Sequence, residues 1–231
     1  MGDLREYIKE SSKIVLNQQK EFQAFGESVY VFIKDPLPAG LNFLSVLKRL
    51  EKIIPSQLVH NLDCIFVGQF EELEQREVQA VYLDGAIYVT NEQENEEDLF
   101  NDLLHETAHV VEELAVDELF ADGQLEREFL AKREKLFNIL YHQGYTLEKS
   151  LYMEPDLNQA FDNFLYKEVG YDKLAILTSG LFLTPYAATS LSEYFANGYE
   201  HYLMGEQRHL RDISPVLHSK IEEIVSIDFG E

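Results

Sequence analysis

The sequence predicts an α+β protein in which a small sheet precedes a predominantly helical half. Short β-branched and aromatic segments end by Thr90, and helical apolar spacing dominates after it, an order that argues against alternating strands and helices. No Gly, Ser or Pro-rich linker divides the 231 residues. We therefore expect residues 1–231 to form a single compact unit, with an N-terminal helix and strand part over about 1–75 and a second part over about 76–231.

Two helices and the strands of the sheet are predicted before the helix that carries the histidine motif. Residues 3–24 and 41–53 have amphipathic helical spacing. Runs rich in β-branched and aromatic residues predict strands over 28–33, 64–68 and 78–90. The last run contains Asp84-Gly85, the dipeptide most typical of a tight hairpin turn, so it should fold back on itself. The result should be a small antiparallel or mixed sheet.

An amphipathic helix is predicted next, over 98–114, and it contains the pentapeptide His105-Glu106-Thr107-Ala108-His109. Side chains at helical spacing form one core-facing stripe: Phe100, Leu103, Leu104, Thr107, Ala108 and Val111. Positions four apart lie one above the other on a helix. Both imidazoles can therefore bind one ion while Glu106 lies beside them.

This pentapeptide has the H-E-x-x-H pattern of zinc hydrolases, in which two histidines bind the metal and the glutamate is the general base. A chance match on the surface is the alternative, since the chain has 7 histidines and many acids. The helical setting, the strand just upstream and an available third ligand favour a metal site. The other histidines have polar or helix-end surroundings and are expected at the surface: His60, His142, His201, His209 and His218.

The remainder of the chain is predicted to be mainly helical. Helices are expected over about 114–140, 156–168 and 187–204. A last helix should begin at Ser214-Pro215, where a capping serine precedes a proline at the first helical position.

The composition excludes several kinds of partner. Lys+Arg 19 against Asp+Glu 42 gives a net charge of -23, which repels nucleic acid and anionic lipid surfaces and favours a cationic peptide or protein substrate. We expect no membrane span and no secretory signal, so a cytoplasmic location is the default, with non-classical export or delivery into a host left open. The single cysteine, Cys64, is expected in a buried strand. The sequence does not specify an oligomeric state.

A catalytic zinc ion takes a third protein ligand and leaves its fourth position to water. One class of enzymes places a histidine six residues after the second ligand, but here that position is Ala115. Glu193, Asn197 and Glu200 share one face of a later predicted helix. A carboxylate ligand from that helix is the remaining option.

At this point the chain resembles a known family. His105-Glu-Thr-Ala-His109, Glu193-Tyr-Phe-Ala-Asn197, Tyr202-Leu203 and the Ser214-Pro215 helix are together similar to the catalytic domain of anthrax lethal factor and of the clostridial Pro-Pro endopeptidases. These are gluzincins, zinc metallopeptidases with H-E-x-x-H followed by E-[FY]-F-A-E. The resemblance covers roughly residues 80 to 225, and it implies a zincin-like metallopeptidase fold and zinc-dependent endopeptidase activity.

The resemblance also implies roles for individual residues. His105, His109 and Glu193 would bind one zinc ion. Glu106 would be the general base, and Tyr186, seven residues before Glu193, would donate to the oxyanion. The strand Ala86–Val89, just before the motif helix, is a candidate edge on which an extended peptide could add as another strand.

Two features depart from the family pattern. Asn197 stands where the family has an acid, and Glu193 comes 84 positions after His109, roughly twice the usual gap. A helical insertion near 120–175 would account for the gap. Asn197, one turn after Glu193, could still orient a ligating imidazole through its amide oxygen, and Glu200 is a solvated or supporting group and the reserve ligand.

Structural alternatives stay open for these residues. Ser190-Leu-Ser-Glu193 also fits a capping box, in which Glu193 would bond the start of its own helix. Tyr186 could be one of 13 tyrosines that pack the core. At the level of function, the alternatives are a catalytically inactive zincin-like module that binds a partner protein and a zinc-dependent hydrolase of a non-peptide amide.

Overall fold

The computed structural model describes residues 21–227 and 229. The chain divides into two compact units, Met1–Val111 with Phe229–Glu231 and Glu112–Asp228. The described strands all belong to the first unit, and helices make up the second. The α+β class expected from the sequence is therefore confirmed at this level. That the two units act as one compact body stays a prediction.

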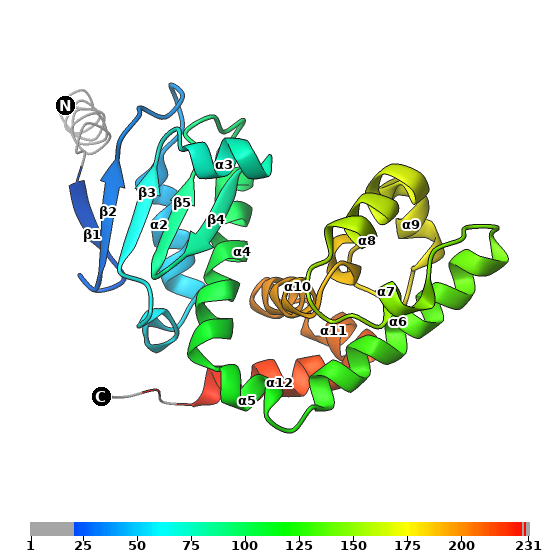
Figure 1. The fold of residues 1–231 in the computed structure, drawn as a ribbon. Coiled ribbons are helices and arrows are strands. Elements are labelled where there is room, and N and C mark those ends of the chain that lie inside the picture. Colours follow the sequence, from blue (N-terminus) through cyan, green and yellow to red (C-terminus); the bar gives the residue numbers. More distant parts are fainter. Residues whose placement is uncertain (1–20, 228, 230–231) are drawn as a thin grey trace, which may run out of the picture. The chain divides into compact units, whose positions relative to one another are not determined.

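The first unit is built on a 5-stranded mixed sheet (Figure 1). Its strands are β1 (Glu21–Ala24), β2 (Val29–Ile33), β3 (Cys64–Val67), β4 (Ala80–Leu83) and β5 (Ala86–Val89). Their order across the sheet is β1-β2-β3-β5-β4. β2, β3 and β5 run parallel, while β1 and β4 pair antiparallel with β2 and β5. The three predicted strand segments are confirmed, and Cys64 is a partly buried residue of β3.

The first strand corrects the predicted helix over 3–24. Glu21–Ala24 form β1, and the earlier part of that helix lies outside the described residues. The chain turns back through Phe25, Gly26 and Glu27, all at positive φ, so that β1 pairs with β2. Pairing with a neighbouring strand outweighs local helical spacing here.

The hairpin predicted at Asp84-Gly85 is confirmed. The two residues join β4 to β5 with φ of 47° and 81°, and a tight turn with positive φ at both central positions matches the twist of the strands.

β5 also pairs with β3 along its other side. The prediction that Ala86–Val89 is an edge strand is therefore wrong, and among the described strands β4 forms that edge.

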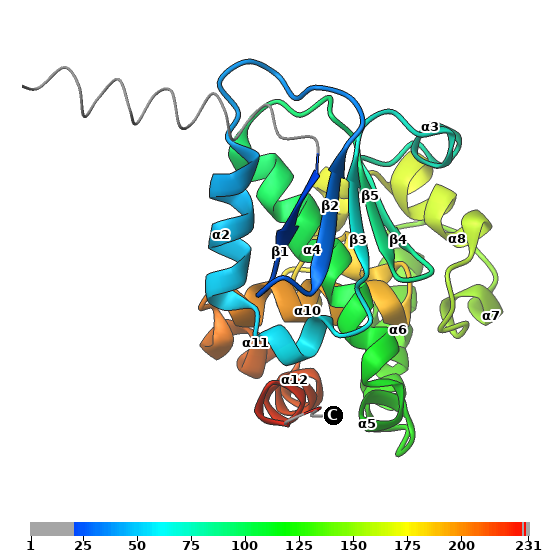
Figure 2. The same ribbon diagram turned by 90° about the vertical axis from the view of Figure 1, so that its left-hand side faces the viewer.

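One face of the sheet is covered by α2 (Phe43–Ile53) and α4 (Glu96–Leu114) (Figures 1 and 2). The side chains on that face are at most 1% exposed: Val29, Val31, Ile65, Val67, Ile87 and Val89. The opposite face carries a row of stacked, partly buried rings from Phe32, Phe66 and Tyr88. Burial of apolar area on the covered face fixes α4 against the sheet.

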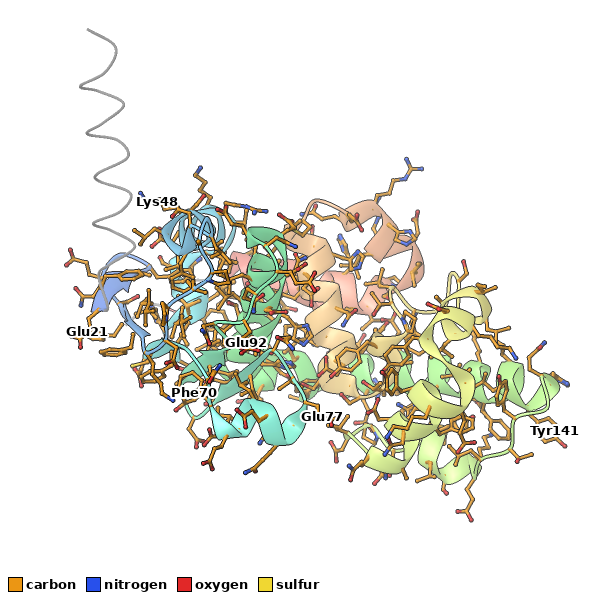
Figure 3. All side chains as sticks on the ribbon, turned by 90° about the horizontal axis from the view of Figure 1, so that it is seen from above. Glu21, Lys48, Phe70, Glu77, Glu92 and Tyr141 are labelled. Atoms are coloured by element: carbon orange, nitrogen blue, oxygen red, sulfur yellow. The ribbon has the colours of Figure 1, made fainter. Side chains whose placement is uncertain are left out.

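Both helices behind the sheet were predictable, and each has a side-chain cap. The Oδ1 atom of Asn42 accepts the N–H of Ser45 at the start of α2. At the start of α4, the Oδ1 atom of Asn95 accepts the N–H groups of Glu97 and Asp98, each at 2.9 Å. Two short helices described in the first unit were not predicted, η1 (Ser56–Val59) and α3 (Glu71–Arg76). Phe70 lies just before α3 (Figure 3), and its ring packs edge-on against Tyr88.

The second unit consists of short and medium helices. They are α5 (Val116–Phe120), α6 (Gln124–His142), α7 (Lys149–Tyr152), α8 (Gln159–Asn163), η2 (Phe164–Val169), α9 (Tyr171–Leu177), η3 (Tyr186–Ala188), α10 (Leu191–Leu203), α11 (Gln207–Ile213) and α12 (Pro215–Ser226). The single helix predicted over 114–140 is wrong, because the chain breaks between α5 and α6, where Gly123 has a φ of 63°. No helix in the described part of the chain is long and apolar enough to cross a membrane.

The last helix begins as predicted, with Ser214 before Pro215 at the first position. The carboxylate of Glu128 on α6 accepts the N–H groups of Val216 and Leu217 at 2.9 and 3.1 Å. A carboxylate is favourable there because the first N–H groups of a helix have no partner within the helix and carry its positive end. Glu128 therefore joins α6 to α12 inside the second unit.

Candidate metal centre

His105 and His109 lie one turn apart on α4 and are both partly buried. Their Nε2 atoms are 3.3 Å apart, and the two rings are close to perpendicular, at 77°. Residues four apart lie one above the other on a helix, and buried apolar residues of α4 hold this helix in the core. The two predicted histidines are thus brought together by local helical geometry.

The separation of these two nitrogens tests whether the site fits a metal ion. Zinc binds imidazole nitrogen at about 2.0–2.1 Å in a tetrahedral arrangement, which places two such nitrogens about 3.3 Å apart. The observed distance matches that value. An N–H···N hydrogen bond between the two neutral rings would have a similar length. The two nitrogens therefore fit a zinc ion, and the distance between them does not by itself require one.

Glu106 is buried on α4 between the two histidines in sequence. Its Oε2 atom accepts a hydrogen bond from the backbone N–H of Tyr82 at 2.6 Å. Tyr82 belongs to β4, so the carboxylate is held at the edge of the sheet. Sequence reasoning missed Tyr82 because the group that makes the contact is a backbone amide, which any residue except proline supplies.

Glu193 lies in the first turn of α10. The hydroxyl oxygen of Ser190 accepts the N–H of Glu193 at 3.1 Å, so the serine half of the predicted capping box is present. The carboxylate of Glu193 accepts a hydrogen bond from the Tyr186 hydroxyl at 3.2 Å. The structure therefore brings together two residues to which the sequence assigned a site, Glu193 and Tyr186.

Tyr186 lies on η3, four residues before the cap of α10, and is 37% exposed. Partial burial, and then the neighbouring carboxylate of Glu193, raise the pKa of Tyr186 above its usual value. The phenol is consequently in its protonated form at neutral pH. In that form the hydroxyl can donate a hydrogen bond.

Asn197 is buried one turn after Glu193 and holds the segment around it together. Its amide nitrogen donates to the backbone oxygen of Glu193 at 3.1 Å. Its amide oxygen accepts a hydrogen bond from Thr184, which in turn accepts the N–H of Ala187. The expected role of Asn197 in orienting an imidazole stays a prediction. Glu200 lies further along α10 and is partly buried.

A hydrogen bond within the second unit joins the ends of the two motif helices. Helix α4 crosses the boundary between the units, with its residues from Glu112 onward in the second. The Ser192 hydroxyl donates to Oε2 of Glu112 at 2.5 Å. Glu112 comes one turn after His109, and Ser192 comes immediately before Glu193.

The remaining histidines are mostly where the sequence predicted. His60, His142 and His209 are exposed, and His201 is partly buried and hydrogen-bonded to Glu206 at 2.6 Å. His218 corrects the prediction, because it is buried on α12 with its ring centroid 5.6 Å from that of Tyr202. Its position on the inner face of α12 follows from helix packing, which the local polar sequence does not reveal.

Comparisons with protein-family models, with curated proteins and with solved structures returned no match for this chain.

Proposed function

We propose that this protein is a zinc-dependent endopeptidase of the gluzincin type, with a zincin-like fold. In this proposal His105, His109 and Glu193 hold one zinc ion, and Glu106 is the general base. The observation that carries the proposal is the pair of Nε2 atoms at 3.3 Å, next to a buried carboxylate on the same helix. That separation suits two ligands of one tetrahedral ion.

Two observations support Glu193 as the third ligand. Glu193 lies in the first turn of α10 and accepts a hydrogen bond from Tyr186, the proposed oxyanion donor of the same unit. The hydrogen bond from Ser192 to Glu112 ties the residue before Glu193 to the turn of α4 that follows His109. Two histidines with one glutamate form a known catalytic zinc ligand set.

The proposed chemistry divides between the ion and the side chains. A zinc ion in such a site lowers the pKa of water and polarises a carbonyl group. Glu106 accepts a proton from the attacking water and passes it to the leaving amine. The backbone N–H of Tyr82 holds the carboxylate in place for this transfer. Tyr186 donates a hydrogen bond to the scissile carbonyl oxygen as negative charge develops there.

The proposed substrate is an extended peptide lying beside β4. An edge strand offers backbone groups along one side, and peptides commonly add to such an edge as a further strand. The net charge of -23 favours a cationic peptide or protein. Because Glu106 bonds to β4, a peptide on that edge would lie next to the proposed base.

Elemental analysis of reconstituted protein tests the metal site. We expect about one zinc ion per chain in the wild type, and loss or weakening of binding in His109→Ala and Glu193→Ala. The exposed His209 provides a matched control, since His209→Ala should keep the metal. No zinc in the reconstituted wild type would overturn the proposal and favour the partner-binding module.

Cleavage of a peptide library then tests the reaction. Glu106→Gln keeps the shape of the side chain but cannot accept the proton, so zinc should stay and cleavage should stop. Retained cleavage would refute the assignment of the base. Zinc binding with no peptide cleavage by the wild type would favour the two alternatives, a hydrolase of a non-peptide amide or a partner-binding module with a structural metal.

A further inference from the structure

The buried guanidinium of Arg133 on α6 makes five hydrogen bonds, all to backbone carbonyl oxygens. Arg133 is 0% exposed. Nε donates to Tyr152 at 3.1 Å, Nη1 to Ala188 at 2.5 Å and Thr189 at 3.1 Å, and Nη2 to Leu151 at 2.8 Å and Glu154 at 3.4 Å. A guanidinium has five N–H donors, so each of them has an acceptor here. Burial lowers the pKa of Arg133 to about 9, which leaves it cationic at neutral pH.

These acceptors belong to two separate segments. Leu151, Tyr152 and Glu154 lie at and just after the end of α7, while Ala188 and Thr189 lie at the end of η3. Carbonyl groups at the end of a helix have no partner within it and carry its negative end, which a cation stabilises. A ring from a third element completes the site, because Phe161 of α8 lies with its centroid 3.7 Å from the Arg133 guanidinium carbon.

The segment at Ala188 and Thr189 carries the two side chains of the candidate site in the second unit. Tyr186 comes two residues before Ala188, and Ser190, which caps α10 at Glu193, comes directly after Thr189. The backbone between Tyr186 and Glu193 is therefore fixed at its midpoint by Arg133. The hydrogen bond between Asn197 and Thr184 fixes the same loop at its start.

We propose that Arg133 is a positioning residue that holds the Tyr186 hydroxyl against Glu193, and this inference rests on the function proposed above. Its guanidinium group donates hydrogen bonds to the Ala188 and Thr189 carbonyls and to carbonyls at the end of α7, and so joins the two segments. Lysine in its place would keep the charge but lose the planar fork that reaches both segments. Arg133→Lys should therefore loosen the Tyr186 segment while the remainder of the fold stays intact.

Lys132 provides a matched control on the same helix. It is also buried, at 6% exposed, and its Nζ atom donates to the backbone oxygens of Leu181 and Ile213 at 2.6 and 2.8 Å. Lys132→Met thus removes a neighbouring buried cation that caps different carbonyls. A general loss of stability would appear in both variants, whereas increased mobility of the segment around Tyr186 should appear only in Arg133→Lys.

Hydrogen exchange measured by mass spectrometry tests the inference without any substrate. In Arg133→Lys we expect at least tenfold faster exchange over residues 151–154 and 186–193, with the sheet strands unchanged, and no such change in Lys132→Met. Phe161→Leu removes the stacked ring but leaves the hydrogen-bonding groups, so it should give a smaller change in the same segments. Unchanged exchange in both the Arg133 and Phe161 variants, or equal change in Lys132→Met, would overturn the inference.

Peptide cleavage separates this inference from the proposed function. In Arg133→Lys we expect kcat to fall about tenfold with KM and zinc content unchanged, because Tyr186 contributes to the reaction step and not to ground-state binding. An active Arg133→Lys enzyme with wild-type kcat would overturn the positioning role and leave the endopeptidase proposal standing. Failure of the wild type to cleave any peptide would count against the endopeptidase proposal. The hydrogen-exchange experiment would still test whether Arg133 holds the Tyr186 segment in place.

Discussion

The hydroxyl of Ser192 donates a 2.5 Å hydrogen bond to Oε2 of Glu112. The two residues are 80 positions apart in the chain, yet each is close in sequence to a proposed zinc ligand. Glu112 follows His109 by one helical turn, and Ser192 directly precedes Glu193. This bond, within the second unit, therefore joins two residues that neighbour the two motifs in the sequence.

Loss of that bond should weaken zinc binding. Groups that orient metal ligands without touching the ion typically change metal affinity by about 10–100-fold when mutated. We expect Ser192→Ala to lower zinc affinity about tenfold, measured by competition with a chelator. Glu112→Gln should have no additional effect in the Ser192→Ala background if the two residues act as a pair. The exposed Ser226 provides a control, since Ser226→Ala should bind zinc like the wild type.

Tyr186→Phe removes the hydroxyl that bonds to Glu193 in the structure and that we propose as the oxyanion donor. We expect kcat to fall by about 10²–10³, as for loss of a single oxyanion donor elsewhere, with zinc content unchanged. Steady-state cleavage of a fluorogenic peptide measures the effect. Tyr166→Phe makes the same chemical change at an exposed tyrosine of the same unit and should leave kcat at the wild-type value. Equal rates for Tyr186→Phe and the wild type would exclude the oxyanion role.

Tyr82→Pro removes the backbone N–H that bonds to Glu106. Proline is tolerated on edge strands whose N–H faces away from the sheet, so the fold should persist. We expect cleavage to fall because the base loses its anchor, while zinc content stays at the wild-type level. Tyr82→Phe keeps the amide and should retain activity. If the proline and phenylalanine variants cleave at the same rate, the amide has no part in placing the base.

Gly198 permits close packing of α10 against α12. A Cβ atom at this position would lie 2.4 Å from Cδ2 of Leu217, well inside contact distance. Overpacking of this kind costs about 1–3 kcal/mol, against a gain of up to about 1 kcal/mol from the better helix propensity of alanine. Gly198→Ala should therefore lower the free energy of unfolding by about 1–2 kcal/mol in urea titrations. Truncating Leu217 to alanine should relieve the clash, so the two changes together should be less than additive.

Lys132 should make stability depend on pH. Burial lowers its pKa in the folded protein from 10.5 to about 8. Between these values the unfolded chain binds more protons than the folded one, so the free energy of unfolding rises with pH. This gain in the free energy of unfolding is complete above about pH 10.4, and it is lost as the pH falls through about 8. The difference in unfolding free energy between wild type and Lys132→Met should shift in favour of the wild type from pH 7.5 to 9.5. A difference that does not change with pH would contradict this.

Several elements of the fold follow from local sequence. The Asp84-Gly85 turn, the capped starts of α2 and α4 and the Ser214-Pro215 start of α12 all depend on residues within a few positions of one another. The wrong predictions left out pairing between strands or, for the helix over 114–140, a break at Gly123. Glu21–Ala24 form a strand because β2 is available to pair with them, and β5 is internal because β3 pairs with the side that β4 leaves open.

For the candidate site, the sequence by itself determined the histidine pair. A spacing of four residues on a helix places the two imidazoles one above the other, so that their Nε2 atoms can come within 3.3 Å of one another. Only the tertiary structure decided the contacts of Glu106 with the Tyr82 amide and of Arg133 with five carbonyl oxygens. These contacts use backbone groups, which are the same in every residue, so no side-chain pattern reports which of them will meet when distant segments pack.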